Sequence, residues 1–303
     1  MCYNKRIMKK KLIILVLSIF VLAILATTLV ACNRATTQGQ LSDFLIDHKE
    51  EVFVYDVTNG LTNTNGTYTV SIKKYPAGST IHDYFREALV NVPKGMLVTG
   101  HLVMGTTEYT TACYFNIVDG TSLMTPASSS RVQKENGEEV FRMQGTYYGA
   151  NFSYERVING ISNSGTIKLS GTYFDNNEFH QSLRTVQTFS TNFSFSFAVP
   201  LVSQTEISAV TLNASCSALE NVETAYTATL DQSAVSCYRI SLSRSTKVAG
   251  LSQTLYYAVD PMKASNSALT MKNVLVKFVE PITSDGETYY VVYTLKNATI
   301  LSD

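Results

Sequence analysis

Four histidines, His48, His82, His101 and His180, are the side chains best suited to acid–base or metal chemistry at neutral pH. No two of them have the His-x-x-x-His spacing that places two imidazoles on one face of a helix, and none belongs to a glutamate-flanked metal motif. We therefore predict ordinary surface or hydrogen-bonded histidines and no metal site.

Motifs for a catalytic nucleophile are also missing. The chain contains no Gly-x-Ser-x-Gly, the turn that exposes the serine of α/β-hydrolases. Residues 71–74 fit Ser-x-x-Lys, but they lie in a predicted strand and lack the Ser-Asp-Asn and Lys-Thr-Gly partners. Residues 175–178 (DNNE) lack the oxygen spacing of a calcium loop, so we interpret them as a turn. We predict no catalytic residue, no cofactor and no enzymatic activity; an envelope hydrolase with two acids meeting in space is a third hypothesis.

The cysteines number five: Cys2, Cys32, Cys113, Cys216 and Cys237. The last three are an odd number, so they cannot all pair internally. Cys216 and Cys237 flank a predicted hairpin, and a disulfide closing that loop would contribute roughly 3 kcal/mol in the loop-entropy model. Three buried free thiols are the favoured alternative.

Residues 12–31 (LIILVLSIFVLAILATTLVA) contain no charge and follow a basic cluster at residues 5–11. A positive head followed by an apolar run is typical of a secretory signal. The run ends in Leu29-Val30-Ala31-Cys32, which resembles the lipobox of bacterial lipoproteins. The resemblance implies that a diacylglycerol is attached to the sulfur of Cys32 and that the chain is cut before it. An uncleaved transmembrane helix is the alternative, and initiation at Met8 would give a more usual signal length.

Removal of the five basic residues of segment 1–31, which has no acidic residue, leaves 19 basic and 24 acidic residues, a formal charge of −5. An acidic body excludes nucleic acid as a partner and is not attracted to an anionic membrane, so a lipid has to anchor it. We predict a signal peptide at 1–31, a flexible tether at 32–40 and an ectodomain at 41–303, on the extracytoplasmic face of the cell membrane. The protein partner stays open.

The ectodomain is rich in β-branched and aromatic residues, which favour strands. Helical spacing of apolar residues predicts short helices at 41–50 and 79–90. Strands are predicted at 51–58, 67–74, 96–104, 107–118, 139–147, 151–158, 166–174, 178–189, 192–199, 224–230, 236–245, 252–259, 273–280 and 288–300.

An internal repeat relates residues 53–71 (FVYDVTNGLTNTNGTYTVS) to residues 152–170 (FSYERVINGISNSGTIKLS). It favours duplicated halves, about 41–150 and 151–303, over two hairpins that share their turn chemistry by convergence.

Residues 192–199 (NFSFSFAV) alternate most cleanly, so Phe193, Phe195 and Phe197 project to one face of a strand. We predict a mainly β, antiparallel fold: a strongly curved sheet or half-barrel, or two stacked sheets, with one or two short helices. The ectodomain loosely resembles the lipoprotein carriers, which fold as a half-open barrel around an apolar cavity. This resemblance implies a non-catalytic envelope lipoprotein that binds a lipid or another apolar or amphipathic ligand, with the three phenylalanines bordering a hollow. The alternative is a surface adhesion or envelope-assembly module that binds protein or glycan.

Overall fold

The structure is a computed structural model, and it describes residues 39–40, 49–83, 87–117, 123–185, 189–245 and 252–302. The signal, Met8, Cys32 and most of the helix predicted at 41–50 lie outside these residues. Within the described ranges, no helix has both the length and the apolar character that crossing a bilayer requires. All the elements belong to one compact unit, Gln38–Asp303.

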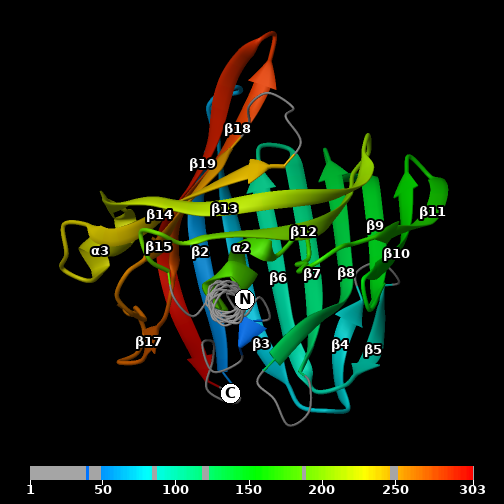
Figure 1. The fold of residues 1–303 in the computed structure, drawn as a ribbon, viewed down its shortest axis with the longest axis horizontal. Coiled ribbons are helices and arrows are strands. Elements are labelled where there is room, and N and C mark those ends of the chain that lie inside the picture. Colours follow the sequence, from blue (N-terminus) through cyan, green and yellow to red (C-terminus); the bar gives the residue numbers. More distant parts are fainter. Residues whose placement is uncertain are drawn as a thin grey trace, which may run out of the picture. The chain divides into compact units, whose positions relative to one another are not determined.

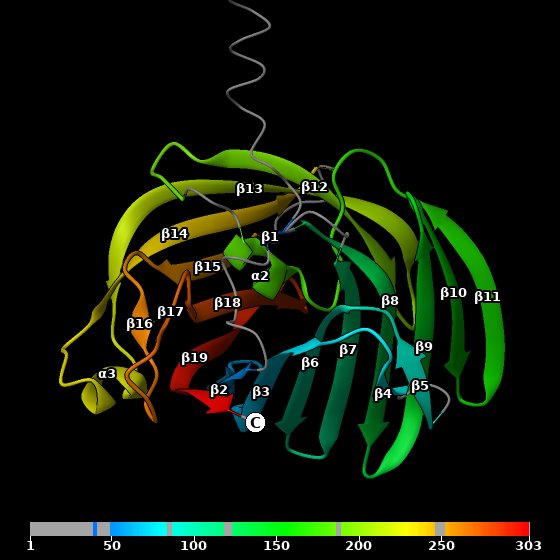
Figure 2. The ribbon, with the colours of Figure 1, turned by 90° about the horizontal axis from the view of Figure 1, so that it is seen from below.

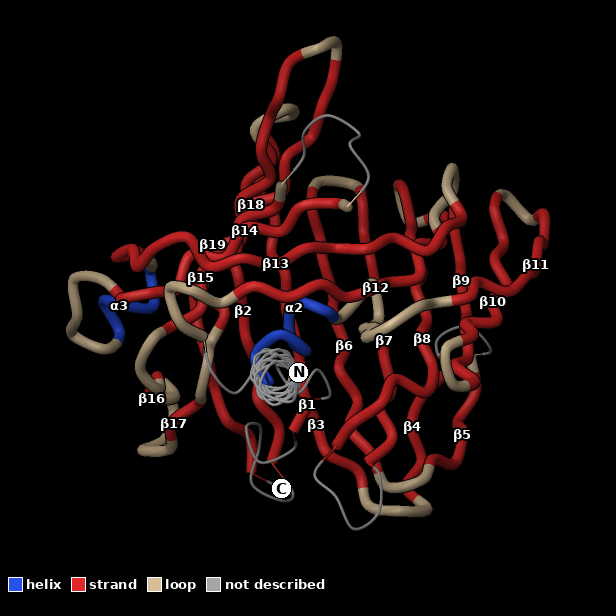
Figure 3. Tube along the Cα trace, viewed as in Figure 1, coloured by secondary structure: helices blue, strands red, loops and turns tan. Residues whose placement is uncertain are grey.

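The protein is mainly β and has very few helices (Figure 3), as the sequence predicts. The strands are β1 (Gly39–Gln40), β2 (Lys49–Asn59), β3 (Thr64–Tyr75), β4 (Ser79–Asp83), β5 (Ala88–Val92), β6 (Gly95–Met104), β7 (Thr107–Ile117), β8 (Leu123–Glu135), β9 (Glu138–Tyr148), β10 (Asn151–Ile158), β11 (Ile161–Lys168), β12 (Ser194–Val202), β13 (Ile207–Val222), β14 (Val235–Arg244), β15 (Gln253–Ala258), β16 (Met262–Lys263), β17 (Thr270–Met271), β18 (Leu275–Ser284) and β19 (Glu287–Ser302). The helices are α2 (Phe179–Ser182), the 3-10 turn η2 (Leu183–Thr185) and α3 (Ala225–Thr229).

One antiparallel sheet contains nearly all the long strands, in the order β11-β10-β9-β8-β7-β6-β3-β2-β19-β18-β15-β14-β13-β12. The sheet is a meander in which the last strand, β19, pairs with the first long strand, β2. It curves into a nearly closed, barrel-like wall that surrounds α2 (Figures 1 and 2). The hairpins β4–β5 and β16–β17 are separate two-stranded sheets. The predicted curved antiparallel sheet is therefore confirmed.

The two ends of the sheet, β11 and β12, do not pair with each other. On β12, Phe197 and Val199 are buried in the main core, whereas Ala198 and Val202 on the opposite face are buried against β9–β11. We call the latter group, with Phe141, Met143, Tyr147, Phe152, Tyr154, Ile167 and Leu169, the second apolar cluster. Because side chains alternate along a strand, β12 lies between two apolar layers. Packing, rather than a backbone ladder, closes this seam.

Three sequence predictions of secondary structure are wrong. The helix predicted at 79–90 is wrong, because Ser79–Asp83 and Ala88–Val92 pair as the hairpin β4–β5, in which Ile81 is buried. The strand predicted at 178–189 contains α2 and η2, which lie inside the sheet, where no neighbouring strand offers a ladder. The strand predicted at 224–230 contains α3. Strands β8 and β13 were not predicted, because serine and polar residues interrupt their apolar pattern.

The two repeated segments both form hairpins, β2–β3 and β10–β11. In the second hairpin, Asn159 and Gly160 both have positive φ, at 48° and 80°, as a two-residue type I′ turn requires. The sheet continues across residue 150 through the paired strands β9 and β10. Duplication of two halves stays a prediction.

Gly145 of β9 lies beneath the ring of Phe152, and a Cβ at this position would approach Phe152 Cζ to 1.9 Å. We expect Gly145→Ala to lower the free energy of unfolding by about 1–3 kcal/mol, because the ring has to leave the second apolar cluster. Denaturant unfolding measures the change. The exposed Ser164→Ala on β11 is the control and should stay within about 0.5 kcal/mol of wild type; an equal loss in both variants would contradict this account.

Candidate ligand-binding site

The interior of the curved sheet is occupied by the connection between β11 and β12. We call residues 172–185 the inner segment. It begins along β12, where Phe174 N donates to Ala198 O (3.0 Å) and Ala198 N donates to Thr172 O (2.7 Å). It then forms α2 and η2, in which Phe179 and Leu183 are buried in the main core. The segment thus supplies both an edge partner for β12 and the filling of the barrel.

Phe193, Phe195 and Phe197 face the interior together, as the alternation predicts, and in the described part of the chain they pack against one another and against the inner segment. Phe193 and Phe195 form an edge contact with 5.1 Å between ring centroids, and Phe195 and Phe197 stack at 5.3 Å. Phe174 of the inner segment packs on Phe197 at 5.1 Å, and Phe179 lies 5.9 Å from the same ring. The inner segment thus covers the row of three phenylalanines, and a hollow bordered by these rings stays a prediction.

Arg184 is the deepest charge of the inner segment, with 1% of its surface exposed. Its Nη1 lies 2.9 Å from Oε2 of the buried Glu51 on β2. Its Nη2 donates to Lys272 O (3.0 Å), and its guanidinium lies 4.7 Å from the ring centroid of Phe53. A buried ion pair is stable only when its remaining polar atoms are also satisfied. Backbone carbonyl oxygens meet that requirement for the guanidinium, whereas Glu51 Oε2 has the ion pair but no well-aligned hydrogen bond.

Two buried carboxyl groups precede the helix. Asp175 Oδ2 accepts a hydrogen bond from Tyr147 (2.6 Å), and Glu178 Oε1 accepts one from Thr111 (3.0 Å). Glu178 Oε2 has no hydrogen-bond partner. Desolvation, together with the neighbouring Asp175 charge, raises the pKa of Glu178 well above its ordinary value, and desolvation raises that of Asp175. Asp175 Oδ1 also accepts from Asn177 N (2.9 Å), so the predicted turn at 175–178 is confirmed.

His180 belongs to a second buried polar chain. Its Nε2 lies 3.2 Å from Oε1 of Gln253, whose amide nitrogen donates to Glu280 Oε1 (3.0 Å), and Tyr293 donates to Glu280 Oε2 (3.3 Å). Desolvation lowers the pKa of His180 to about 4 and raises the pKa of Glu280. His180 is therefore neutral at pH 7. The other described histidines are surface residues: 42% of the His82 side chain and 47% of the His101 side chain are exposed.

The disulfide considered between Cys216 and Cys237 is wrong, because all three described cysteines are free and buried. Cys216 lies opposite Ile240 across β13 and β14, whereas Cys237 lies opposite Glu220. The three residues from Cys237 to Ile240 span about 10 Å of strand, beyond the Cα separation of about 4.4–6.8 Å that a disulfide bridges. Cys32 is outside the described residues.

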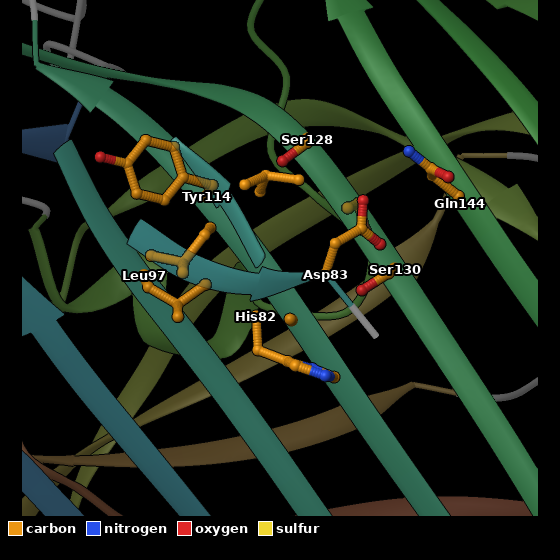
Figure 4. Close-up of a pocket in the computed structure, with 11 residues that line it drawn as sticks. His82, Asp83, Leu97, Tyr114, Ser128, Ser130 and Gln144 are labelled. Carbon is orange, nitrogen blue, oxygen red and sulfur yellow. The ribbon is translucent and has the colours of Figure 1, made fainter. Parts of the chain in front are cut away.

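A small pocket lies on the outer face of the sheet, under the β4–β5 hairpin (Figure 4). Tyr114, Ser128, Ser130 and Gln144 from β7, β8 and β9 form its floor. Its cavity of about 40 Å³ has room for two or three waters, too little for a lipid chain. Asp83 points toward the floor and His82 away from it, so the two do not form an acid–base pair (Figure 4).

Within the described residues, no three His, Cys, Asp or Glu side chains converge to hold a metal ion. The sequence analysis named His180 and residues 175–178, but it did not predict the burial of Asp175, Glu178, Gln181 and Arg184. The only signal was the density of charged and polar residues at 175–184, which is unusual for a strand buried in a sheet.

No protein-family model matches the chain. No curated protein matches it either. Among solved structures, it is similar to a β-barrel-like protein of a domain of unknown function (DUF1849) from Brucella abortus, with a TM-score of 0.51 and 11% identity over 85% of this chain and 100% of that one. At this identity the similarity concerns the fold alone. A candidate lipoprotein from Parabacteroides distasonis aligns with a TM-score of 0.29 and 9% identity over 85% of this chain and 99% of that one, too low to support an argument.

The ion pair of Arg184 and Glu51 gives the first prediction for this site. Arg184→Met should lower the free energy of unfolding by about 3–5 kcal/mol, because it leaves Glu51 as an uncompensated buried charge. The double variant Arg184→Met/Glu51→Leu should recover most of that loss. A double-mutant cycle by denaturant unfolding measures the coupling; a double variant as unstable as the sum of the two single variants would contradict it.

The raised pKa of Glu178 gives a prediction of pH dependence. The folded protein retains the proton of Glu178 at pH values where the unfolded chain, near its ordinary value of 4.5, has lost it. The group therefore costs stability increasingly as pH rises above 4.5. We expect Glu178→Gln to stabilise the protein by an amount that grows from pH 4.5 to pH 8, measured by denaturant unfolding. The exposed Glu223→Gln should show no such growth; a constant difference for Glu178→Gln would refute the assignment.

Proposed function

We propose that this chain is a non-catalytic envelope lipoprotein, anchored to the extracytoplasmic face of a membrane by a lipid on Cys32. In this proposal it binds an apolar or amphipathic ligand inside its curved sheet. The basic cluster, the apolar run and the lipobox-like Leu29-Val30-Ala31-Cys32 support the anchor. The formal charge of −5 on the body supports anchoring by a lipid rather than by electrostatic attraction.

The observation that carries the ligand-binding proposal is the way the barrel is closed. The seam between β11 and β12 is held by the second apolar cluster, without a backbone ladder between the two strands. Among the described residues of the inner segment, Tyr173 forms an isolated bridge to Ala198 of β12, flanked by the hydrogen bonds Phe174 N to Ala198 O and Ala198 N to Thr172 O. The inner segment can therefore leave the interior by breaking these edge bonds and its side-chain contacts, without opening a ladder between two strands of the main sheet. Its departure would expose the aromatic row of Phe193, Phe195 and Phe197 to a ligand.

The buried polar groups of the inner segment are consistent with its release from the interior. Glu178, with an unpaired oxygen, and the neutral His180 are both buried with the segment in place. Such groups reduce the free energy that holds the segment inside. The closed form would then be the empty state, in which the segment substitutes for the ligand and keeps water away from the aromatic row.

A second function, adhesion or envelope assembly, is favoured by the solid packing of the interior together with exposed apolar residues. Tyr148 and Ile161, at the ends of β9 and β11, are 68% and 75% exposed, and Leu89 of the β4–β5 hairpin is 73% exposed. Such residues contact partners in protein interfaces. In this case the interior would stay closed when the protein acts.

A reversible lock on the inner segment tests the proposed function. Tyr173 and Ala198 are bridge partners, so cysteines at the two positions meet the separation that a disulfide needs. We expect the full-length Tyr173→Cys/Ala198→Cys protein to bind a fluorescent fatty acid when reduced and to lose at least about tenfold in affinity when oxidised, because the segment cannot move. Fluorescence titration in nonionic micelles measures both states.

The single variant Ala198→Cys is the matched control and should bind equally under both conditions. Cys113, Cys216 and Cys237 are buried, and burial raises the pKa of each thiol, so they should not react. Absence of binding in the reduced protein would favour the adhesion or assembly function. Equal binding in the oxidised and reduced states would show that the segment does not gate the interior.

A further inference from the structure

Two arginines flank Met143 of β9 on the inner face of the sheet, one on each neighbouring strand. Arg131 of β8 and Arg156 of β10 are both opposite Met143 of β9, so the three side chains project to the same face. Met143 belongs to the second apolar cluster. The guanidinium of Arg131 lies 4.9 Å from the ring centroid of Phe141, another member of that cluster. Two cations are thus placed at the border of an apolar layer.

Arg131 has no counter-ion within the described part of the chain, and its Nε is buried without a hydrogen-bond partner. Desolvation lowers the pKa of its guanidinium. Tyr109 lies close enough to interact with it electrostatically, but a neutral phenol does not compensate the charge. Buried guanidinium groups are normally paired, because an uncompensated charge in a protein interior costs free energy. The fold of the protein gives no reason for this cation.

Arg156 is partly committed to the fold. Its Nη1 donates to the carbonyl oxygens of Ser203 and Gln204, in the turn between β12 and β13. Its Nε, however, is buried and unpaired like that of Arg131. Two arginines on either side of β9 therefore each carry one N–H donor, Nε, without a hydrogen-bond partner. Planar guanidinium donors match the oxygens of a carboxylate or a phosphate.

The surrounding polar groups leave this cationic site unneutralised. Gln204 donates through its side-chain amide to Gln133 Oε1 (3.4 Å), and Gln133 in turn donates to Glu135 Oε1 (3.0 Å). Glu135, at the end of this network, is exposed to solvent and forms no ion pair with either arginine within the described residues. The buried Glu178 accepts a hydrogen bond from Thr111, the cross-strand neighbour of Arg131, and likewise forms no ion pair with it in the described part of the chain. The screened charge of Glu135 weakens the positive potential at the site without cancelling it.

We infer that Arg131 and Arg156 bind the carboxylate or phosphate head group of an anionic amphiphile, whose apolar chain lies against the second apolar cluster. This inference rests on the proposed function and specifies its ligand: the head group is anionic rather than neutral or cationic. It also predicts that the seam selects anionic ligands over neutral ones, because Arg156 contacts the turn that follows β12. An entering head group would provide the missing acceptors for both Nε atoms.

The test compares four probes that differ in one group each: hexyl phosphate, hexanol, hexyltrimethylammonium and inorganic phosphate. Full-length protein in dodecyl maltoside micelles is dialysed to equilibrium against each probe, and protein-free micelles give the blank. We expect hexyl phosphate to bind at least about tenfold more tightly than hexanol and hexyltrimethylammonium, as charge-assisted hydrogen bonds predict. Inorganic phosphate should bind more weakly than hexyl phosphate, because it lacks the chain.

Arg131→Gln should reduce the affinity for hexyl phosphate to that for hexanol and leave hexanol binding unchanged. Arg131→Lys should retain part of the difference, since it keeps the charge but not the planar donors. Arg239→Gln on β14, whose side chain is 45% exposed, is the matched control and should change neither affinity. The midpoint of thermal unfolding should stay the same or rise in Arg131→Gln, because an uncompensated charge is removed.

Equal binding of hexanol and hexyl phosphate, or an unchanged affinity in Arg131→Gln, would overturn the inference and leave the proposed binding of apolar ligands intact. Failure of every hexyl compound to bind would instead contradict the proposed function. Inorganic phosphate that binds as tightly as hexyl phosphate would overturn the amphiphile assignment in favour of a free anion. A lower unfolding midpoint in Arg131→Gln would give Arg131 a structural role and would also overturn it.

Discussion

The contact between Arg184 and Glu51 holds the inner segment inside the sheet, and the arrangement of the interior depends on it. The guanidinium comes from the connection between β11 and β12, and the carboxylate comes from β2, in the middle of the sheet. Taking both charges out of water is costly, and the cost is met only while the segment stays in place and Lys272 and Asn273 supply their carbonyl oxygens. Apolar packing alone could accept several positions of the segment, whereas this pair specifies one.

The other contacts of the interior can be traced outward from Arg184. Arg184 positions α2, and α2 places Phe179 against Phe197 of β12. The start of the segment covers the free edge of β12, and the second face of β12 then meets β9–β11. A strand with both faces buried is unusual in an antiparallel sheet, which commonly has one face in water. Here the overlap of the two sheet ends provides the second apolar layer.

The sequence predicts the strands of the curved sheet better than the inner segment that the sheet surrounds. Alternation in residues 192–199 correctly orients Phe193, Phe195 and Phe197, and the strands predicted at 51–58 and 67–74 are found as β2 and β3. Both depend on neighbours along the chain. The filling of the interior depends on partners far apart in sequence, such as Arg184 with Glu51, and no local pattern encodes such a pair. The same limit applies to the hairpin β4–β5, whose apolar residues follow a helical spacing although the segment forms two paired strands against the outer face of the sheet.

The pairing of β2 with β19 has a consequence for the order in which the protein can be made. These strands share eleven residue pairs, from Val291 opposite Asn59 to Ser302 opposite Lys49, so the first long strand waits for a partner that is synthesised after all the others. Closure over such a sequence separation is slow, because the loop entropy is lost before the contacts form. If the chain is exported, β2 and the inner face it shares with β3 would emerge first and remain without their partner until β19 has crossed. During that interval the incomplete sheet would expose apolar residues and would be prone to aggregate. A periplasmic or surface chaperone that shields apolar strands would bind at this stage.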